Sequence, residues 1–168
     1  AINYNNLTLD NSLGAALTGV VEEKSIGGTL SIQSGVLNIT NGFFNINAID
    51  AANQTISFSG ASKIVSSNNL NLPNLTFQSG FISLNFDNTP QVNIAGNISN
   101  SSASIGSQIK GILNFNGTNQ TITSSPNSIA FGGATSFSSS GEMAINNNIS
   151  IVGDLFLNSG ILNISNRT

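Results

Sequence analysis

The sequence predicts an all-β protein, and specifically a right-handed parallel β-solenoid of about seven short coils. Three observations lead to this prediction. Apolar and polar residues alternate with period two, glycine and asparagine separate almost all of the alternating runs, and short motifs recur along the chain. No window of a dozen residues shows the 3.6-residue apolar period of a helix. An antiparallel β-sandwich is the alternative.

Asparagine and serine supply most of the polarity. The 168 residues include 28 Asn and 26 Ser, whereas only 7% of the residues are charged. Both side chains are short and bond readily to nearby backbone in turns. A net charge of −3 argues against a nucleic-acid partner, which needs a basic face, and against an anionic membrane surface. No apolar run reaches 18 residues, so membrane insertion is not expected.

A short motif led by glycine recurs five times. It consists of glycine, two apolar residues, Asn or Ser, a further apolar residue and a small polar one. The copies are GVLNIT from Gly35, GFFNIN from Gly42, GFISLN from Gly80, GILNFN from Gly111 and GILNIS from Gly160. Glycine tolerates positive φ, which tight corners need, so the motif predicts a corner followed by a strand.

Longer matches indicate degenerate copies of a larger unit. The segment GTLSIQSGVLNIT from Gly28 aligns without a gap with GDLFLNSGILNIS from Gly153. Two NQTI elements, ending at Ile56 and Ile122, are 66 residues apart, and NNLTLDN from Asn5 resembles PNLTFQS from Pro73. The chain therefore reads as roughly two and a half copies of a unit of about 60 to 68 residues.

Roughly twenty strands of about three to five residues are expected, with the apolar residue of each alternating pair facing inward. The expected inward residues are Leu7, Leu9, Leu30, Ile32, Leu37, Ile39, Ile56, Phe58, Leu75, Phe77, Ile82, Leu84, Val92, Ile94, Leu113, Phe115, Ile149, Ile151, Leu155, Leu157, Leu162 and Ile164.

The strand spacing favours the solenoid over the sandwich. Strands of one motif class recur at multiples of about 20 residues, which is the size of a three-sided coil. The pair Asn41-Gly42 between two strand-like runs is typical of a type I′ hairpin and favours the sandwich. In a solenoid, the doubled apolar residues of the glycine motif could both pack inward at a corner. This places Val36, Phe43, Phe81, Ile112 and Ile161 in the core.

The string ILNFNGTNQTITSSPNSIAFGGATSF, followed by INNNISIVGDLFLNSGILNIS, resembles the repeats of very large surface proteins and adhesins of Bacteroidetes bacteria and of β-helix exoproteins. The resemblance runs from Phe115 to Ile122, through a strand at Ala134 to Ser138, and from Asn148 to Asn163. It implies export to the cell surface and a role in adhesion, gliding or filament building. The region around Glu22, Glu23 and Lys24 does not align with the pattern.

We therefore expect the whole chain, residues 1–168, to be one solenoid segment of a longer repetitive protein. The expected function is that of an extracellular structural or adhesive repeat region, a surface adhesin or filament stalk, without catalysis. Neighbouring repeats or identical subunits are expected at its ends, and surface glycans are possible further partners. The alternative is a polysaccharide-active, glycan-binding or ice-binding β-helix.

Chemistry-bearing residues are few, and no catalytic, cofactor or metal site is predicted. Without His or Cys, the usual nucleophilic triads and zinc sites cannot form. The charged residues other than the Glu22-Glu23-Lys24 cluster are scattered, and that cluster is expected to be a solvated loop. Calcium at Asp50 or Asp154 and an ice-binding threonine array are the remaining candidates. The scattered residues are Asp10, Asp50, Asp87, Glu142, Asp154 and Arg167, and the recurring threonines are Thr8, Thr40, Thr55, Thr76 and Thr121.

Overall fold

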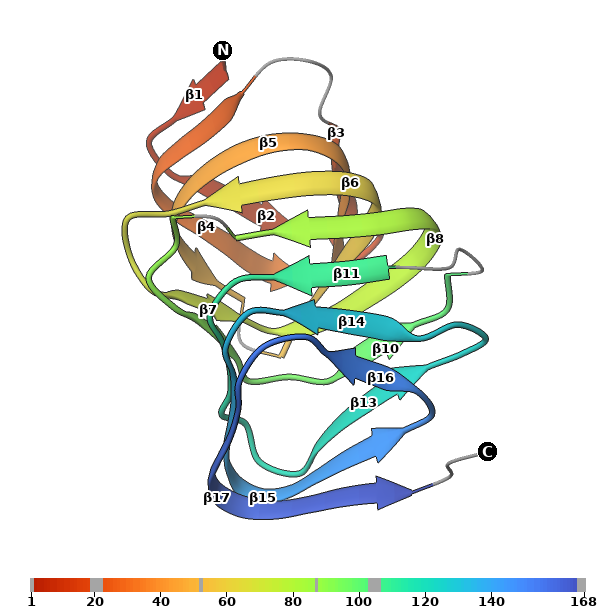
Figure 1. The fold of residues 1–168 in the computed structure, drawn as a ribbon. Helices are drawn as coiled ribbons and strands as arrows, with labels where there is room; N and C mark the ends of the chain where they lie inside the picture. Colours follow the sequence, from red (N-terminus) through yellow and green to blue (C-terminus); the bar gives the residue numbers. More distant parts are fainter. Residues whose placement is uncertain (1, 19–22, 52, 87, 103–106, 166–168) are drawn as a thin grey trace.

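The chain forms a parallel β-solenoid of about seven turns in a computed structural model that describes residues 2–18, 23–51, 53–86, 88–102 and 107–165. The strands wind around one axis, with the two termini at opposite ends of the stack (Figure 1). Every pairing between the described strands is parallel. The predicted solenoid is confirmed, and the antiparallel sandwich is wrong.

Three faces, which we number in chain order, make up each coil. Face 1 contains two kinds of strand segment, whole short strands and parts of longer bent ones. They are β1 (Ile2–Tyr4), the start of β4 (Lys24–Ser34), the middle of β5 (Val36–Asp50), the ends of β6 (Thr55–Val65) and β8 (Asn74–Asn85), β11 (Ser107–Lys110), β14 (Ile129–Gly132) and β16 (Ile149–Ile151).

Face 2 follows face 1 in each coil. It consists of β2 (Leu7–Asp10), the ends of β4 and β5, β7 (Leu70–Leu72), β9 (Val92–Ile94), β12 (Leu113–Phe115) and the starts of β15 (Thr135–Asn146) and β17 (Leu155–Ser165). Face 3 consists of β3 (Ala15–Thr18), the starts of β5, β6 and β8, β10 (Ile98–Asn100), β13 (Gln120–Ser124) and the ends of β15 and β17.

The strands are fewer and several are longer than predicted, because six of them bend around a corner without ending. β5 is 15 residues long and contributes to all three faces. Its register against β6 shifts between Thr40 and Gly42, where Asn41 has a φ of 42° and Gly42 a φ of 138°. Asn41-Gly42 is therefore a corner inside a continuous strand, and the hairpin prediction is wrong.

The glycine that leads the recurrent motif does form a corner, as predicted. Gly35, Gly42, Gly111 and Gly160 all have positive φ, between 80° and 144°. The strands that follow them lie on different faces: Leu37 on face 3, Phe44 on face 1 and Leu113 on face 2. The same corner-and-strand motif thus serves all three corners of the coil.

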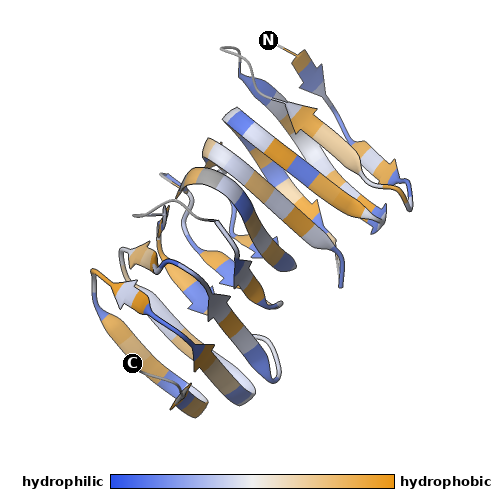
Figure 2. Cartoon of the chain, turned by 90° about the vertical axis from the view of Figure 1, so that its right-hand side faces the viewer, coloured by the Kyte–Doolittle hydropathy of each residue, from blue (hydrophilic) through white to orange (hydrophobic). Residues whose placement is uncertain are grey.

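The core is a column of apolar side chains along the axis, and Figure 2 shows the alternation of hydrophobic and hydrophilic residues along the strands. Of the expected inward residues, those from Leu30 to Phe115 whose side chains the structure describes are buried, which confirms the period-two prediction for the middle of the stack. Leu7, Leu9, Ile149, Ile151 and Leu162 are partly buried and pack against this core. The side chain of Ile82 lies outside the described part.

Aromatic rings from adjacent coils fill the centre of the core. Phe58 and Phe77 are stacked with ring centroids 5.7 Å apart. The ring centroid of Phe115 lies 5.4 Å from that of Phe131 and 5.1 Å from that of Phe137, so three rings from two faces pack together. These separations are in the range that aromatic pairs prefer.

The doubled apolar residues of the glycine motif do not both pack inward, so that prediction is wrong. Val36, Phe81, Ile112 and Ile161 are between 37% and 67% exposed, and Phe43 is partly buried. In the copies from Gly35, Gly42 and Gly111 the second apolar residue takes the inward position instead: Leu37, Phe44 and Leu113 are buried. The strand keeps strict alternation directly after the corner, which turns the first apolar residue outward.

Asparagine side chains join successive coils at the corners. The Oδ1 atom of one asparagine accepts the backbone N–H of a residue in the next coil, over distances of 2.7–3.1 Å. We call these five residues the corner asparagines: Asn6 bonded to Thr29, Asn41 to Ala61, Asn74 to Asn97, Asn97 to Thr121, and Asn119 to Glu142. The carboxamide satisfies a backbone donor where the bend interrupts the ladder.

Glycine lies directly opposite four of the corner asparagines. The residues just before the donors are Gly28, Gly60, Gly96 and Gly141. A Cβ atom at any of these glycines would lie 2.0–2.6 Å from the Oδ1 atom of the facing asparagine. At these four positions the carboxamide therefore occupies the space that a side chain in place of glycine would need.

The coil register explains the sequence repeats. Ile56 pairs with Leu75, Leu75 with Ile98, and Ile98 with Ile122, so the two NQTI elements lie on face 3 exactly three coils apart. The NNLTLDN and PNLTFQS segments begin on different faces. Their similarity reflects the corner asparagines Asn6, directly before β2, and Asn74, the first residue of β8.

We expect Gly28→Ala to destabilise the fold by about 1–3 kcal/mol, because its Cβ would meet the Asn6 carboxamide at 2.0 Å. Gly27→Ala is the matched control, since its Cβ would make only an ordinary van der Waals contact, with the Tyr4 carbonyl oxygen at 3.9 Å. Urea unfolding of the two variants measures the difference. Equal stability of both variants would contradict the asparagine–glycine pairing.

We expect Phe115→Ala to lower the free energy of unfolding by about 3–5 kcal/mol, because the ring is fully buried between two others. Phe81→Ala should change it by no more than about 0.5 kcal/mol, since Phe81 is on the outer surface. Chemical unfolding measures both. A large loss for Phe81→Ala would show that the outward apolar residues stabilise the coil.

Candidate functional site

The charged residues singled out in the sequence do not form a common site. Asp10 ends β2 near the first coil and accepts the Ser34 hydroxyl at 2.7 Å. Glu142 accepts an amide N–H of Asn163 at 2.7 Å near the other end. Asp50 pairs with Ser31 in the second and third coils, whereas Asp154 begins the last coil, so these two candidate calcium ligands are far apart along the axis.

Within the described ranges, no group of three or more acidic residues could hold a metal ion. Glu22, Asp87 and Arg167 lie outside those ranges. The predicted solvated loop is wrong for Lys24, which begins β4 and places its Nζ atom 5.9 Å from the centre of the Phe44 ring. This cation–π contact is a packing interaction at the N-terminal end of the core. No helix of the described chain is long and apolar enough to cross a membrane.

The threonines do not form a single row. Thr8 is on face 2, whereas the other four are on face 3 at three different positions across the face. Thr40 pairs with Ser59, Thr55 with Asn74, and Thr76 with Ser99. A regular threonine array of the kind expected for ice binding is therefore not present among the described residues.

A ladder of amides runs along the outside of face 2. The Asn93 amide donates to Asn71 Oδ1 at 2.9 Å, the Asn114 amide donates to Asn93 Oδ1 at 3.0 Å, and the Ser136 hydroxyl donates to Asn114 Oδ1 at 2.9 Å. Each side chain thus bonds to its equivalent in the preceding coil. These side chains bond to one another and thereby help to hold successive coils together.

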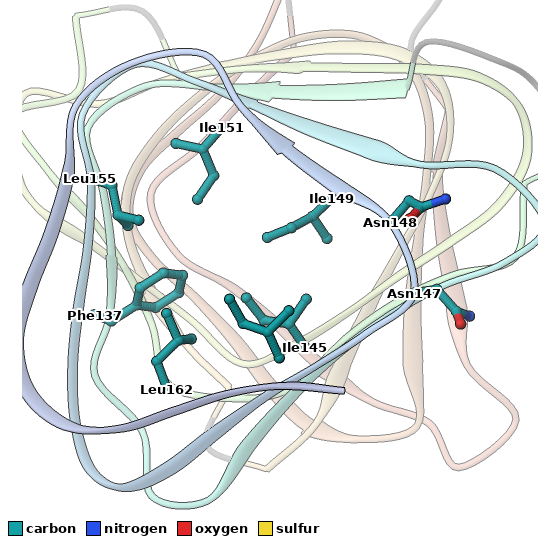
Figure 3. A pocket seen from close by; sticks show the side chains of 9 residues that line it. Phe137, Ile145, Asn147, Asn148, Ile149, Ile151, Leu155 and Leu162 are labelled. Carbon is teal, nitrogen blue, oxygen red and sulfur yellow. The ribbon is translucent and has the colours of Figure 1, made fainter. Parts of the chain in front are cut away.

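The most distinctive surface is the open end formed by the last coil. Figure 3 shows its apolar side chains pointing toward a hollow on the axis, whereas Asn147 and Asn148 point away from it. The hollow has a volume of about 380 Å³. Its lining contains no charged side chain and consists of Phe137, Ile145, Asn147, Asn148, Ile149, Ile151, Leu155, Leu162 and Ile164. A second hollow of about 210 Å³ adjoins Leu157 and Ile161 on the same coil.

The inward residues at the open end are of the same apolar kind as those elsewhere in the core, but they are more exposed to solvent. Leu155, Leu157 and Ile164 are expected inward residues, yet they are 44–61% exposed. Their partners in the matching segment from Gly28 are Leu30, Ile32 and Ile39, which are at most 4% exposed. Leu155 and Ile164 line the hollow on the axis, and Leu157 pairs with the buried Phe137, which confirms the inward orientation. Such positions are buried where another coil follows.

A shallower groove of about 410 Å³ lies at the corner between faces 1 and 2, beside the exposed Ile112 and Pro90. Its floor is the buried Phe86 and two backbone glycines, Gly111 and Gly133. The groove offers apolar surface and two polar side chains but no charged group. It has no arrangement that points to a particular ligand.

Two buried hydroxyl groups, Ser62 Oγ and Thr135 Oγ1, have no hydrogen-bond partner. Thr135 faces the axis between Leu113 and Leu155 of the neighbouring coils, close to the open end. An unsatisfied hydroxyl in an apolar core costs stability, because its bonds to water are lost without replacement.

Thr135→Val should raise the free energy of unfolding by about 1 kcal/mol, because valine has nearly the same shape and removes the unpaired hydroxyl. Thr123→Val is the control: Thr123 is only partly buried on face 3, and its change should stay within about 0.5 kcal/mol. Denaturant unfolding reports both. A loss of stability in Thr135→Val would show that the hydroxyl has a partner in solution.

No protein-family model, no curated protein and no solved structure matches this chain.

Proposed function

We propose that the chain is an extracellular structural or adhesive rod segment, part of a surface adhesin or filament stalk at a bacterial cell surface. The observation that carries the proposal is the continuous apolar column that runs through the stacked coils of the described residues. A column of this kind can be continued by a further coil, from a neighbouring repeat or an identical subunit. The proposal does not include catalysis, and among the described residues no three acidic side chains gather in a group that could hold a metal ion.

The solenoid architecture is suited to spanning distance. Each coil adds about 4.8 Å along the axis, so about seven coils extend roughly 35 Å. Each coil contacts only its neighbours, so the same local interactions can be repeated without limit on length. A rod can therefore be lengthened by adding coils while its cross-section stays constant.

The bonds between coils suit a protein that works outside the cell. Neutral amides and hydroxyls provide most of the side-chain bridges, including the corner asparagines and the face 2 ladder. Such bonds are little affected by ionic strength, unlike exposed ion pairs, which salt screens. The outward residues available for contact with surface glycans are likewise mostly Asn, Ser and Thr.

We expect the midpoint of thermal unfolding to shift by less than about 2 °C between low and molar sodium chloride, because few charges contribute to the stack. Differential scanning calorimetry at fixed pH and protein concentration measures the shift. A strong loss of stability in high salt would contradict the view that neutral bonds hold the coils together.

The proposed location is tested by antibodies against residues 1–168 on cells of the source organism. Intact cells should be labelled, and brief protease treatment of those cells should remove the label. A cytoplasmic protein serves as the control for intactness. Labelling that requires permeabilised cells would contradict an extracellular role.

A further inference from the structure

We propose that the outer surface of face 3 binds a neutral, unbranched polysaccharide chain that lies along the solenoid axis. This inference rests on the proposed adhesive function and gives it a ligand class and a site. The site is a line of six polar side chains in six successive coils, which we call the face 3 row: Asn38, Ser57, Thr76, Ser99, Thr123 and Asn146.

The register between coils makes the face 3 row continuous. Each member pairs with the next one in the parallel ladder, from the first to the sixth. Leu75 and Phe77, on either side of Thr76, are buried in the core, so Thr76 points outward, and the other members alternate in the same way. Neighbouring strands lie about 4.8 Å apart, so the five steps of the row cover roughly 24 Å.

The side chains of the face 3 row make no hydrogen bond to any other residue that the structure describes. The polar groups around them are bonded. On the same face, the hydroxyl oxygens of Thr40 and Ser59 are 3.0 Å apart, and Asn74 Oδ1 accepts the backbone N–H of Asn97 at 2.9 Å. On face 2, the members of the amide ladder bond to one another. The row therefore keeps its donors and acceptors for a ligand.

Ser57 is the most enclosed member of the row. It is only 3% exposed and lies between the larger side chains of Asn38 and Thr76 in the neighbouring coils. Its chain neighbours Ile56 and Phe58 are fully buried on the axis side, so the Ser57 hydroxyl is directed toward the outer face. A hydroxyl that is enclosed in this way and has no partner in the protein is poorly hydrated, so a bond from a ligand would stabilise it.

The chemistry of the row suits the hydroxyl groups of a sugar. Hydroxyl and carboxamide groups both donate and accept hydrogen bonds, as sugar hydroxyls do. The row contains no charged side chain, and in the described strand segments of face 3 the one charged residue, Glu142, accepts an amide N–H of Asn163. An acidic polysaccharide would find no cation there. A protein partner would find none of the aromatic or arginine anchors on which protein interfaces depend.

The repeat of the row favours an extended polymer over a crystal surface. One coil advances by about the length of one ring in an extended β-linked sugar chain, so successive rings would meet successive coils. Binding to ice would need one type of side chain at equal height, whereas the row mixes Asn, Ser and Thr and encloses Ser57 between its neighbours. Contacts along one chain act together, so individually weak bonds can give useful affinity.

Oligosaccharides of increasing length provide the first test. We expect wild-type protein to bind linear xylo-, cello- or manno-oligosaccharides in isothermal titration calorimetry. Affinity should rise with chain length and level off at about five or six rings, which is the length of the row. It should be unchanged in high salt, because no ion pair forms. Polygalacturonate, an acidic chain, should bind more weakly than the neutral chains.

Substitutions that keep the shape of the side chain provide the second test. Thr76→Val should weaken binding of the longest oligosaccharide about two- to tenfold, the usual contribution of one neutral hydrogen bond. Combining it with Ser99→Ala and Thr123→Val should weaken binding at least about tenfold. Thr8→Val, on the outer side of face 2, is the matched control and should bind like wild type. Circular dichroism should be the same for all variants, because the substituted side chains make no bond within the described protein.

Failure of the wild-type protein to bind any of these oligosaccharides would overturn the proposal, and so would full binding by the triple variant. Tighter binding of polygalacturonate than of the neutral chains, or thermal hysteresis in freezing solutions, would also overturn it, because face 3 would then recognise an anion or ice. These outcomes are separable from the proposed function. Protein that antibodies find on intact cells but that binds no glycan would leave the rod segment in place and remove only the polysaccharide site.

Discussion

The structure depends on the covering of each coil by the next. A single coil consists of three short strands around a few apolar side chains, and it can neither satisfy its backbone nor exclude water by itself. Leu30 and Leu155 show this dependence directly, because they are matching residues and yet Leu30 is fully buried whereas Leu155 is 44% exposed. Stability, length and the character of both ends all follow from this one requirement.

Backbone hydrogen bonding between coils is most difficult to maintain at the corners. The many asparagine and glycine residues of the chain compensate for this. A bend interrupts the backbone ladder, and a corner asparagine such as Asn41 or Asn119 supplies the missing acceptor to the next coil. The facing glycine leaves room for the carboxamide. The abundance of asparagine and glycine is thus a structural property of the stack. It fixes the register between coils while leaving the outer faces neutral and polar.

Much of the fold was predictable because the period-two alternation and the repeat lengths are local signals. These signals predicted the solenoid, the inward residues such as Leu113, and the equivalence of the two NQTI elements. The errors arose where a local pattern has two meanings. Asn41-Gly42 fits a hairpin as well as a corner, and the outward position of Ile112 depends on where the bend ends. The pairing of Asn6 with Gly28 could not be predicted, since it needs the register between coils. The open end as a candidate site likewise emerges only when the coils are stacked.

Hydrogen exchange resolved along the chain tests most directly whether coverage by a neighbouring coil governs this molecule. In dilute protein, backbone amides of the central strands β6, β8 and β13 should exchange slowly, and those of β16 and β17 should exchange much faster despite their regular strand geometry. Protection of the last coil equal to that of the central coils in the isolated molecule would contradict the account.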